Sequence, residues 1–244
     1  MLSKNKIKLI TSLKQKKYRQ QYGLFVAEGI KTVKELLHSN LQLQELYTTT
    51  LEFDVLDDLA IHITDTELRK ISSLKNPNHV LAVFKIPESR PINFSKLIVA
   101  LDSIRDPGNL GTIIRLCDWF GIDDLVCSEE TVDCYNPKVI QATMGSITRV
   151  NISYVDLKKT LSQATTDIFG TFMNGENIYQ ATVPDVGVLI LGNEANGISG
   201  KIENLVTKKL AIPQFGDVQE TESLNVASAA AIFLSEFRRQ STGK

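Results

Sequence analysis

Apolar and polar residues follow two patterns in the last three-fifths of the chain. Short aliphatic runs such as Val188 to Leu191 end at Gly or Pro, as buried strands do, and they alternate with segments whose apolar residues recur at helical spacing. The predicted strands are residues 97–101, 125–127, 150–153, 168–171, 188–191 and 210–212. The predicted helices are residues 110–120, 138–144, 157–164, 199–206 and 223–239. This alternation predicts an α/β fold with a mainly parallel sheet and helices on both faces.

A smaller α/β unit is predicted before it. Its predicted helices are residues 2–20, 30–38, 54–59 and 65–71, and its predicted strands are residues 24–29, 43–48, 60–63 and 80–86. Thr64 and Glu67 have the spacing of a capping box at the start of the fourth helix. A polar stretch with Pro87 and Pro91 then has the composition of a linker. We therefore expect one domain over residues 1–90 and a second over residues 96–244.

Composition narrows the class of protein. The 244 residues are 43% hydrophobic and 23% charged, which is typical of a soluble globular chain, and no apolar run is long enough to span a bilayer. The N-terminus is polar and rich in lysine, unlike a secretory signal, so we expect a cytoplasmic protein. The three cysteines and three histidines lack the spacing of a disulfide framework or a metal site, and no metal is implied.

Charge is unevenly distributed although the net charge is only −1. Every charged residue before Glu28 is basic: Lys4, Lys6, Lys8, Lys14, Lys16, Lys17 and Arg19. Such a stretch can neutralise the phosphates of a nucleic acid, and a solvated amphipathic helix explains it at least as well.

Three polar clusters follow predicted strands in the second half. In the first, Asn109 stands after a Pro-Gly turn where a helix N-cap is expected, and Arg115 follows six residues later. Both can reach a pocket at the start of the helix. Alternatively, Asn109 only caps the helix, and Arg115 pairs with Asp118 or another surface acid.

The second and third clusters have the same two interpretations. The second runs from Gly192 through Glu194 to Gly197, and its glycines permit close approach of a ligand to the backbone. The third, residues 222–225, begins an alanine-rich helix and includes Ser223 and Asn225. Each can instead be purely structural, the second as a strand-to-helix turn and the third with Ser223 or Glu222 as a helix cap.

The order of these clusters is more specific than any one of them. Asn-x-Gly-x-x-x-Arg from Asn109, Gly-Asn-Glu-x-x-Gly from Gly192, and Ile212-Pro213 followed by Glu-Ser-Leu-Asn-Val resemble the three motifs of the SpoU/TrmH family. These proteins are RNA ribose 2′-O-methyltransferases of the SPOUT class. The resemblance covers residues 97–240. It implies a trefoil-knotted α/β domain, S-adenosylmethionine (SAM) as methyl donor, and a homodimer with the active site at its interface.

The first half resembles the family's N-terminal substrate-binding domain, which is similar to ribosomal protein L30e. The match rests on Phe25 to Gly29 followed by a helix. Because a separate RNA-recognition module is the family's usual arrangement in enzymes that act on ribosomal RNA, the resemblance favours ribosomal RNA as substrate over transfer RNA.

The resemblance also implies roles for individual residues. The family's polar active-site set corresponds to Asn109, Arg115, Glu194, Ser223 and Asn225. The positions whose backbone groups hold SAM correspond to Gly192, Ile212 and Leu224. Met173, Asn174 and Gly175 are expected to flank the same pocket. The chain departs from the family in its longer loop over residues 214–222, with Gln214 in place of a common Met.

The expected reaction is in-line attack of a ribose 2′-hydroxyl on the sulfonium methyl of SAM. Because a guanidinium keeps its proton, Arg115 is expected to bind phosphate and stabilise the developing alkoxide rather than act as the base. Two alternatives remain at this point: an RNA-binding factor with this fold but no activity, and a nucleotide-dependent oxidoreductase, whose glycine fingerprint the sequence lacks.

Overall fold

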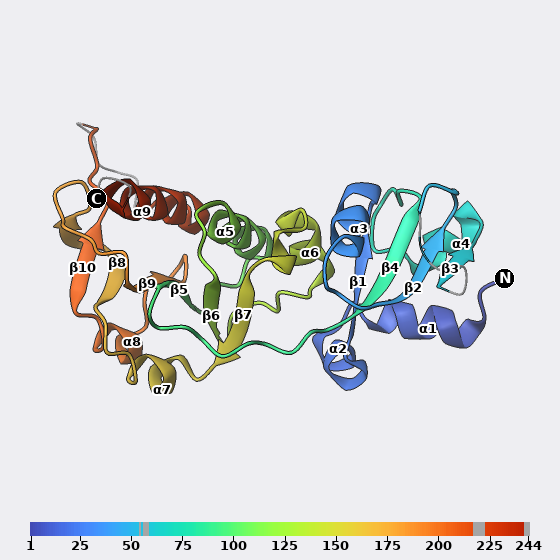
Figure 1. Cartoon of the computed structure of the whole chain (residues 1–244), viewed down its shortest axis with the longest axis horizontal. Coiled ribbons are helices and arrows are strands. Elements are labelled where there is room, and N and C mark those ends of the chain that lie inside the picture. Colours follow the sequence, from blue (N-terminus) through green and yellow to red (C-terminus); the bar gives the residue numbers. More distant parts are fainter. Residues whose placement is uncertain (54, 56–58, 217–222, 242–244) are drawn as a thin grey trace. The chain divides into compact units, whose positions relative to one another are not determined.

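A computed structural model describes residues 1–53, 55, 59–216 and 223–241 and divides into two compact units (Figure 1). Unit 1 contains residues 1–88 together with residues 133–148. Unit 2 contains residues 89–132 and 149–244. Each unit has its own sheet.

Unit 1 is built on a four-stranded sheet with the order β1-β4-β2-β3. Its strands are β1 (Leu24–Glu28), β2 (Leu43–Thr48), β3 (Ala60–His62) and β4 (Val80–Lys85). Strand β4 pairs antiparallel with β1 and β2, whereas β2 and β3 are parallel. Its helices are α1 (Lys4–Ser12), α2 (Lys16–Tyr22), α3 (Ile30–Leu37) and α4 (Asp65–Ile71). The structure confirms the capping box, in which Thr64 Oγ1 accepts from the backbone N–H of Glu67 and the Glu67 carboxylate accepts from that of Thr64.

The first predicted helix is wrong as a single element. The chain turns at residues 13–15, between α1 and α2, because the buried Arg19 guanidinium reaches back and donates to the Leu13 carbonyl at 2.8 Å. The predicted helix over residues 54–59 falls largely outside the described residues.

A segment from the second half of the chain belongs to unit 1. It carries α6 (Pro137–Thr143) and the 3₁₀ turn η1 (Ser146–Thr148). Asp133 accepts hydrogen bonds from the guanidinium of Arg19, and the rings of Tyr135 and Phe25 lie 4.8 Å apart. These contacts join residues far apart in sequence, so the predicted boundaries, which keep residues 133–148 with the second domain, could not anticipate them.

Unit 2 has a six-stranded sheet in which every pairing is parallel, with the order β10-β8-β9-β5-β6-β7. Its strands are β5 (Leu97–Asp102), β6 (Asp124–Ser128), β7 (Asn151–Val155), β8 (Ile168–Asn177), β9 (Gly187–Gly192) and β10 (Lys208–Ala211). The central strands β5 and β9 are almost wholly buried, as expected for a sheet covered on both faces.

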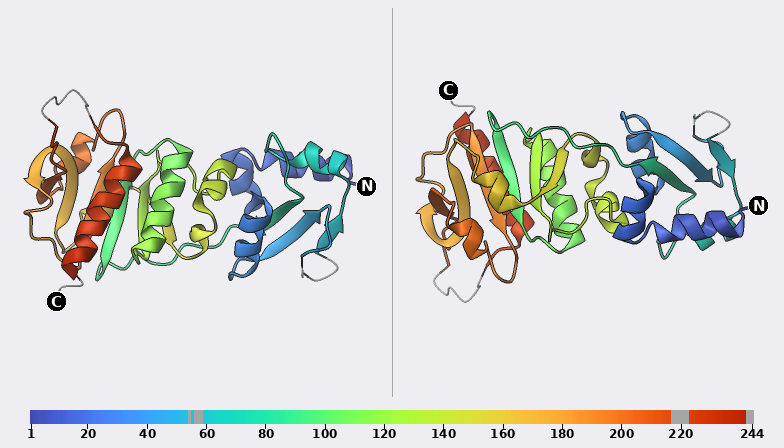
Figure 2. Two further views of the ribbon diagram at one scale, coloured as in Figure 1. Left: turned by 90° about the horizontal axis from the view of Figure 1, so that it is seen from above. Right: turned by 90° about the horizontal axis from the view of Figure 1, so that it is seen from below.

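Helices cover both faces of this sheet (Figures 1 and 2). They are α5 (Pro107–Trp119), α7 (Leu157–Leu161), α8 (Gly200–Glu203) and α9 (Val226–Ser241). Leu157 of α7 and Ile202 of α8 pack with Ile98 and Ile190 on one face. On the opposite face α5 and α9 lie side by side, as the left view of Figure 2 shows. The α/β fold with a parallel sheet is therefore confirmed, and the trefoil knot stays a prediction.

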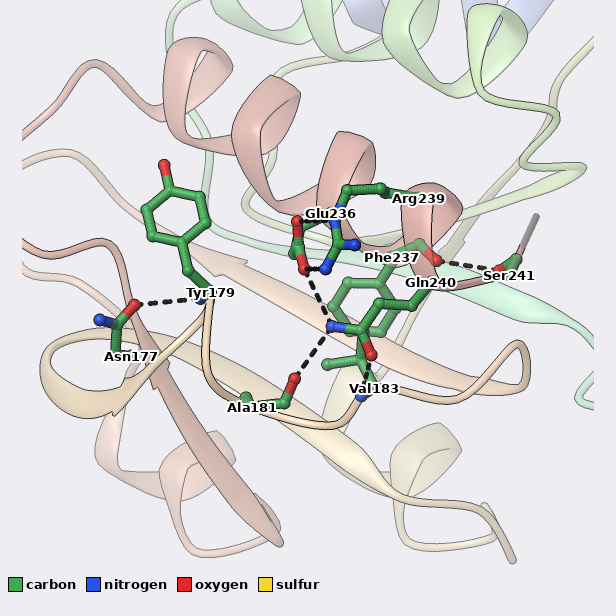
Figure 3. Close-up of polar contacts among 9 residues, drawn as sticks. All are labelled: Asn177, Tyr179, Ala181, Val183, Glu236, Phe237, Arg239, Gln240 and Ser241. Atoms are coloured by element: carbon green, nitrogen blue, oxygen red, sulfur yellow. Dashed lines mark hydrogen bonds and ion pairs between the residues drawn. The ribbon is translucent and has the colours of Figure 1, made fainter. Parts of the chain in front are cut away.

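The C-terminal end of α9 is fastened to the loop that precedes β9 (Figure 3). The side chain of Gln240 accepts from the backbone N–H of Val183 at 3.1 Å and donates to the carbonyl of Ala181 at 2.9 Å. Gln240 also donates to the buried carboxylate of Glu236, which accepts two further bonds from Arg239. These bonds fix the C-terminal half of α9 relative to the sheet.

Candidate active site

The first polar cluster forms the turn between β5 and α5. Asp106 is the N-cap of α5, because its side chain accepts from the backbone N–H of Asn109 at 2.8 Å, and Pro107 occupies the first helical position. The prediction that Asn109 caps this helix is therefore wrong. Asn109 lies three residues after the cap, and its side-chain amide is available for contacts outside the helix.

Asn109 joins the three clusters through that amide. Its Nδ2 donates to Glu194 Oε1 at 2.7 Å, and its Oδ1 accepts from Nδ2 of Asn225 at 2.9 Å. Residues separated by 85 and 116 positions in sequence thus form one chain of hydrogen bonds. The polar residues of three separate loops meet at one place.

Asn225 also caps α9. Its Oδ1 accepts from the backbone N–H groups of Ala227 at 3.0 Å and Ser228 at 3.2 Å. Ser223 therefore does not cap this helix, contrary to one alternative interpretation of the sequence. Glu222, the other candidate cap, lies outside the described residues. Because Asn225 uses both ends of its amide, the start of α9 is held directly against Asn109.

The second cluster is a tight hairpin after β9. The backbones of Asn193 and Gly197 exchange two hydrogen bonds of 3.0 and 2.8 Å, which leaves Glu194 at the exposed tip. The Asn193 side chain donates to the carbonyl of Ser103 at 2.7 Å and so ties the hairpin to the end of β5. A Cβ on Gly192 would lie 2.2 Å from the carbonyl carbon of Gly197, so the loop closes in this way only with glycine there.

Two residues without a role in the sequence-based prediction support this arrangement. Asp102 is buried and accepts from both the backbone N–H and the hydroxyl of Ser199, at 2.7 and 2.6 Å. Ser103 adopts a left-handed backbone with φ of 64°, an uncommon conformation for serine, and directs its carbonyl to Asn193. The signal available in the sequence was the acidic residue that ends an otherwise aliphatic strand.

A cavity of about 790 Å³ lies beside the hairpin in unit 2. Its lining includes all three positions predicted to hold the cofactor, Gly192, Ile212 and Leu224, together with Glu194 and Ser223. The size and the mixture of apolar side chains with backbone polar groups suit a nucleoside-sized ligand. In the part of the chain that the structure describes, no cluster of His, Cys, Asp and Glu could hold a metal ion.

Part of the cavity lining comes from β8. Pairing of β8 with β10 shifts register between Lys209 and Leu210, so residues 171–175 loop out of the ladder. Met173 and Asn174 on this bulge line the cavity, as expected. Gly175 does not; a Cβ there would lie 2.7 Å from the carbonyl carbon of Leu210, so glycine lets β10 approach.

Arg115 is not brought to this cavity. Its side chain is exposed on α5, outside the lining residues, and it forms no ion pair or hydrogen bond within the described ranges. The alternative pairing with Asp118 is wrong, because Asp118 binds Arg149. Trp119, four residues after Arg115, is 84% exposed on the same helix.

Comparison with known proteins gives matches over both halves of the chain. Residues 96–235 match the model of the SpoU rRNA Methylase family, and residues 4–82 match that of the MRM3-like substrate binding domain. The chain is 30% identical to 23S rRNA (guanosine(2553)-2′-O)-methyltransferase RlmP of Bacillus subtilis over 96% of both proteins.

Solved structures with the same fold cover nearly the whole chain. A TrmH-family protein from Porphyromonas gingivalis superposes with a TM-score of 0.89 at 34% identity, covering 98% of this chain and 99% of that one. An rRNA methyltransferase from Sinorhizobium meliloti, solved with AdoMet bound, gives a TM-score of 0.86 at 29% identity, covering 98% and 96%.

Proposed function

Because the chain belongs to the SpoU rRNA methylase family, we propose that it transfers the methyl group of SAM to a ribose 2′-hydroxyl of ribosomal RNA. The observation that supports this most strongly is the hydrogen-bond chain from Glu194 through Asn109 to Asn225. It joins the three motif loops at the rim of a cavity of suitable size. Relatives named as rRNA 2′-O-methyltransferases favour ribosomal over transfer RNA.

The residues present in the cavity fit SAM. Backbone groups at Gly192, Ile212 and Leu224 would meet the donors and acceptors of the adenine edge, and the side chains of Ile212 and Leu224 would cover its faces. When bound, SAM supplies an electrophilic methyl group on a positively charged sulfur. The relative from Sinorhizobium meliloti, whose structure contains AdoMet, has the same fold.

The polar residues position the acceptor. Asn109 and Asn225 lie outside the cavity lining, and their hydrogen bonds hold Glu194 and the start of α9 in fixed places. Ser223, which lines the cavity, would then face the ligand. Such preorganised groups favour reaction mainly by orienting the ribose hydroxyl in line with the methyl group. Arg115 would bind the phosphate of the target nucleotide and stabilise the negative charge that develops on the 2′-oxygen.

The site requires a second copy of the chain. Arg115 is exposed and outside its own chain's cavity, and Trp119 presents a large apolar surface on the same face of α5. In a homodimer joined through this face, Arg115 of one protomer would reach the cavity of the other, and Trp119 would be covered.

Residues 1–90 would serve as the RNA substrate-binding domain and residues 96–244 as the methyltransferase domain. The match of residues 4–82 to a substrate-binding domain supports this division of labour. No helix in the described ranges has the length and apolar character needed to cross a bilayer. We place the protein in the cytoplasm, where its proposed substrate occurs.

The proposal is tested by incubating the purified protein with radiolabelled SAM and ribosomal RNA, with transfer RNA in parallel. We expect label in ribosomal RNA that survives as a 2′-O-methylnucleoside after nuclease digestion. Label found only in transfer RNA would show that transfer RNA, and not ribosomal RNA, is the substrate. SAM binding by calorimetry without any transfer would point to an RNA substrate absent from the assay, whereas no SAM binding would identify an RNA-binding factor without activity.

A further inference from the structure

The basic residues at the N-terminus are not equivalent. Arg19 is only 2% exposed and is bound by Asp133, and Lys6 pairs with Glu45. Both cations form ion pairs within unit 1, so neither is available to bind the phosphates of a partner. In contrast, Lys4, Lys8 and Lys17 are exposed and form no ion pair within the described ranges. The excess positive charge of this region is therefore concentrated on the outer faces of α1 and α2.

Two aromatic side chains accompany this charge on α2. Tyr18 and Tyr22 are one helical turn apart, their ring centroids lie 6.3 Å apart, and their planes are within 14° of parallel. Tyr22 is 46% exposed. The ammonium of Lys17 lies 4.6 Å from the centroid of the Tyr18 ring. This stacked pair lies beside a cation, with Tyr18 half-buried and Tyr22 exposed, so it is not part of the core.

The short helix that carries these rings is held firmly. Arg19 is its one buried residue, and its guanidinium binds both the Leu13 carbonyl at 2.8 Å and the Asp133 carboxylate, with Nε at 2.9 Å from Oδ2. Gly23 ends the helix in a left-handed conformation with φ of 61°. Since one internal anchor fixes the helix, its outer face is presented at little conformational cost on binding.

We propose that Tyr18, Tyr22 and Lys17 form a docking surface for unpaired nucleotides of the RNA substrate, with bases stacked on the tyrosines and phosphates bound by Lys17. This inference rests on the proposed function. Sequence-tolerant stacking on aromatic side chains, combined with cations that follow the backbone, is the usual chemistry of single-stranded RNA recognition. A duplex would not offer its base faces to these rings.

The test measures binding of a labelled single-stranded RNA of about 12 nucleotides and of a duplex of equal length by fluorescence anisotropy. The native protein should prefer the single strand. Replacing both tyrosines by leucine, Y18L/Y22L, should weaken single-strand binding by at least about fivefold and leave duplex binding unchanged. The matched change to phenylalanine, Y18F/Y22F, keeps both rings and should bind like the native protein.

Charge is tested separately. Lys17→Gln should lower the affinity and reduce the slope of log affinity against log salt by about 0.7, whereas the tyrosine variants should keep the native slope. Lys31→Gln, the same change at an exposed position of α3, serves as the control and should have no effect on the preference for single strands. Thermal melting of each variant reports whether unit 1 is folded.

The outcomes distinguish this surface from the active site. Equal affinity of Y18L/Y22L and native protein for the single strand, or equal native affinity for single strand and duplex, would overturn the proposal. If the native protein bound neither short RNA probe but still bound SAM, this proposal would be overturned, and the proposed methyl transfer to ribosomal RNA would not be contradicted. If the native protein did not bind SAM, the proposed function itself would be contradicted.

Discussion

A methyl group on Gly192 would have to occupy space already taken by the backbone of its own loop. The nearest atoms to such a Cβ are the carbonyl carbon of Gly197 at 2.2 Å and the backbone nitrogen of Ile198 at 2.3 Å. Neither atom can move without opening the hairpin that carries Glu194. Gly192 therefore sets the shape of one wall of the cavity, independently of any ligand.

Gly192→Ala should weaken SAM binding by at least about tenfold, measured by calorimetry, because the hairpin must shift away from the cavity. Gly200→Ala is the matched control, since a Cβ there meets nothing within 4 Å. It should bind SAM like the native protein. Equal affinities of the two variants would show that this wall of the cavity does not contact the cofactor.

Arg115→Ala should reduce methyl transfer by about 10²- to 10³-fold, because a charge that stabilises the 2′-oxygen in the transition state is removed. Since the proposed partner of Arg115 is the phosphate and 2′-oxygen of the RNA rather than SAM, SAM affinity should remain native. Turnover and calorimetry on the same preparation check both expectations. Near-native turnover of Arg115→Ala would show that Arg115 has no role in methyl transfer.

Single residues also show what sequence could and could not predict. Residue types in motif order identified Gly192, Ile212 and Leu224, which line one cavity. The sequence could not show that Asp106 rather than Asn109 caps α5, because both residue types are good caps. Nor could it show that Arg19 is buried, since its partner Asp133 is 114 positions away.

At the scale of elements, α9 links the active site to the body of unit 2. Asn225 at its start binds Asn109, and Gln240 near its end binds the loop before β9 (Figure 3). Hydrogen bonds from Arg239 and Gln240 lower the pKa of Glu236 to about 2. The ionised form of the Glu236 carboxylate is therefore more stable in the folded protein than in the unfolded chain.

Because this pKa is lowered, the stabilisation by Glu236 is fully present above the ordinary value of 4.5 and is lost as pH falls towards 2. Glu236→Gln should lower the melting temperature of unit 2 by about 2–6 °C at pH 7. The difference from native protein should shrink between pH 4.5 and 2. Thermal melting across this range measures both effects.

Asp123→Asn provides the matched control for that series. Asp123 pairs with Lys96, but both side chains are about half exposed, at 50% and 58%. Removing such a pair should change the melting temperature by less than about 2 °C. A Glu236→Gln variant as stable as Asp123→Asn at pH 7 would show that the bonds of Figure 3 do not hold α9.

Local patterns predicted most elements well, and the exceptions have physical causes. The capping box at Thr64 fixed the start of α4, and the predicted strand over residues 43–48 coincides with β2. Strand β8 continues to Asn177, beyond the predicted end at residue 171, because its partner β10 skips the bulged residues 171–175. Pairing between strands decides such a feature, and a pattern along one strand does not contain it.

At the scale of the whole molecule, the largest departure from the sequence-based prediction is the path of residues 133–148. They follow β6 in sequence but pack in unit 1, through Asp133, Tyr135 and α6. Periodicity assigned α6 correctly as a helix and could not assign it to a unit, because that choice depends on contacts with residues over a hundred positions away.

The proposed dimer predicts complementation between two impaired variants, assayed at a SAM concentration too low to load the Gly192→Ala cavity. A mixed dimer of Arg115→Ala and Gly192→Ala chains contains one site with an intact cavity and an intact Arg115 from the other chain. Co-expression and co-purification of the two should restore roughly a quarter of the native turnover, since half of the dimers are mixed and each has one complete site. No recovery in verified mixed dimers would mean that Arg115 serves its own chain.

The most direct test of the central claim is analysis of nucleosides in ribosomal RNA after incubation with the protein and SAM. Digestion followed by mass spectrometry should reveal a new 2′-O-methylnucleoside with the native protein, and about 10²- to 10³-fold less of it with Arg115→Ala in the same reaction time. A methyl group found on a base, or a ribose methylation that persists at native levels in both Arg115→Ala and Gly192→Ala, would contradict the account.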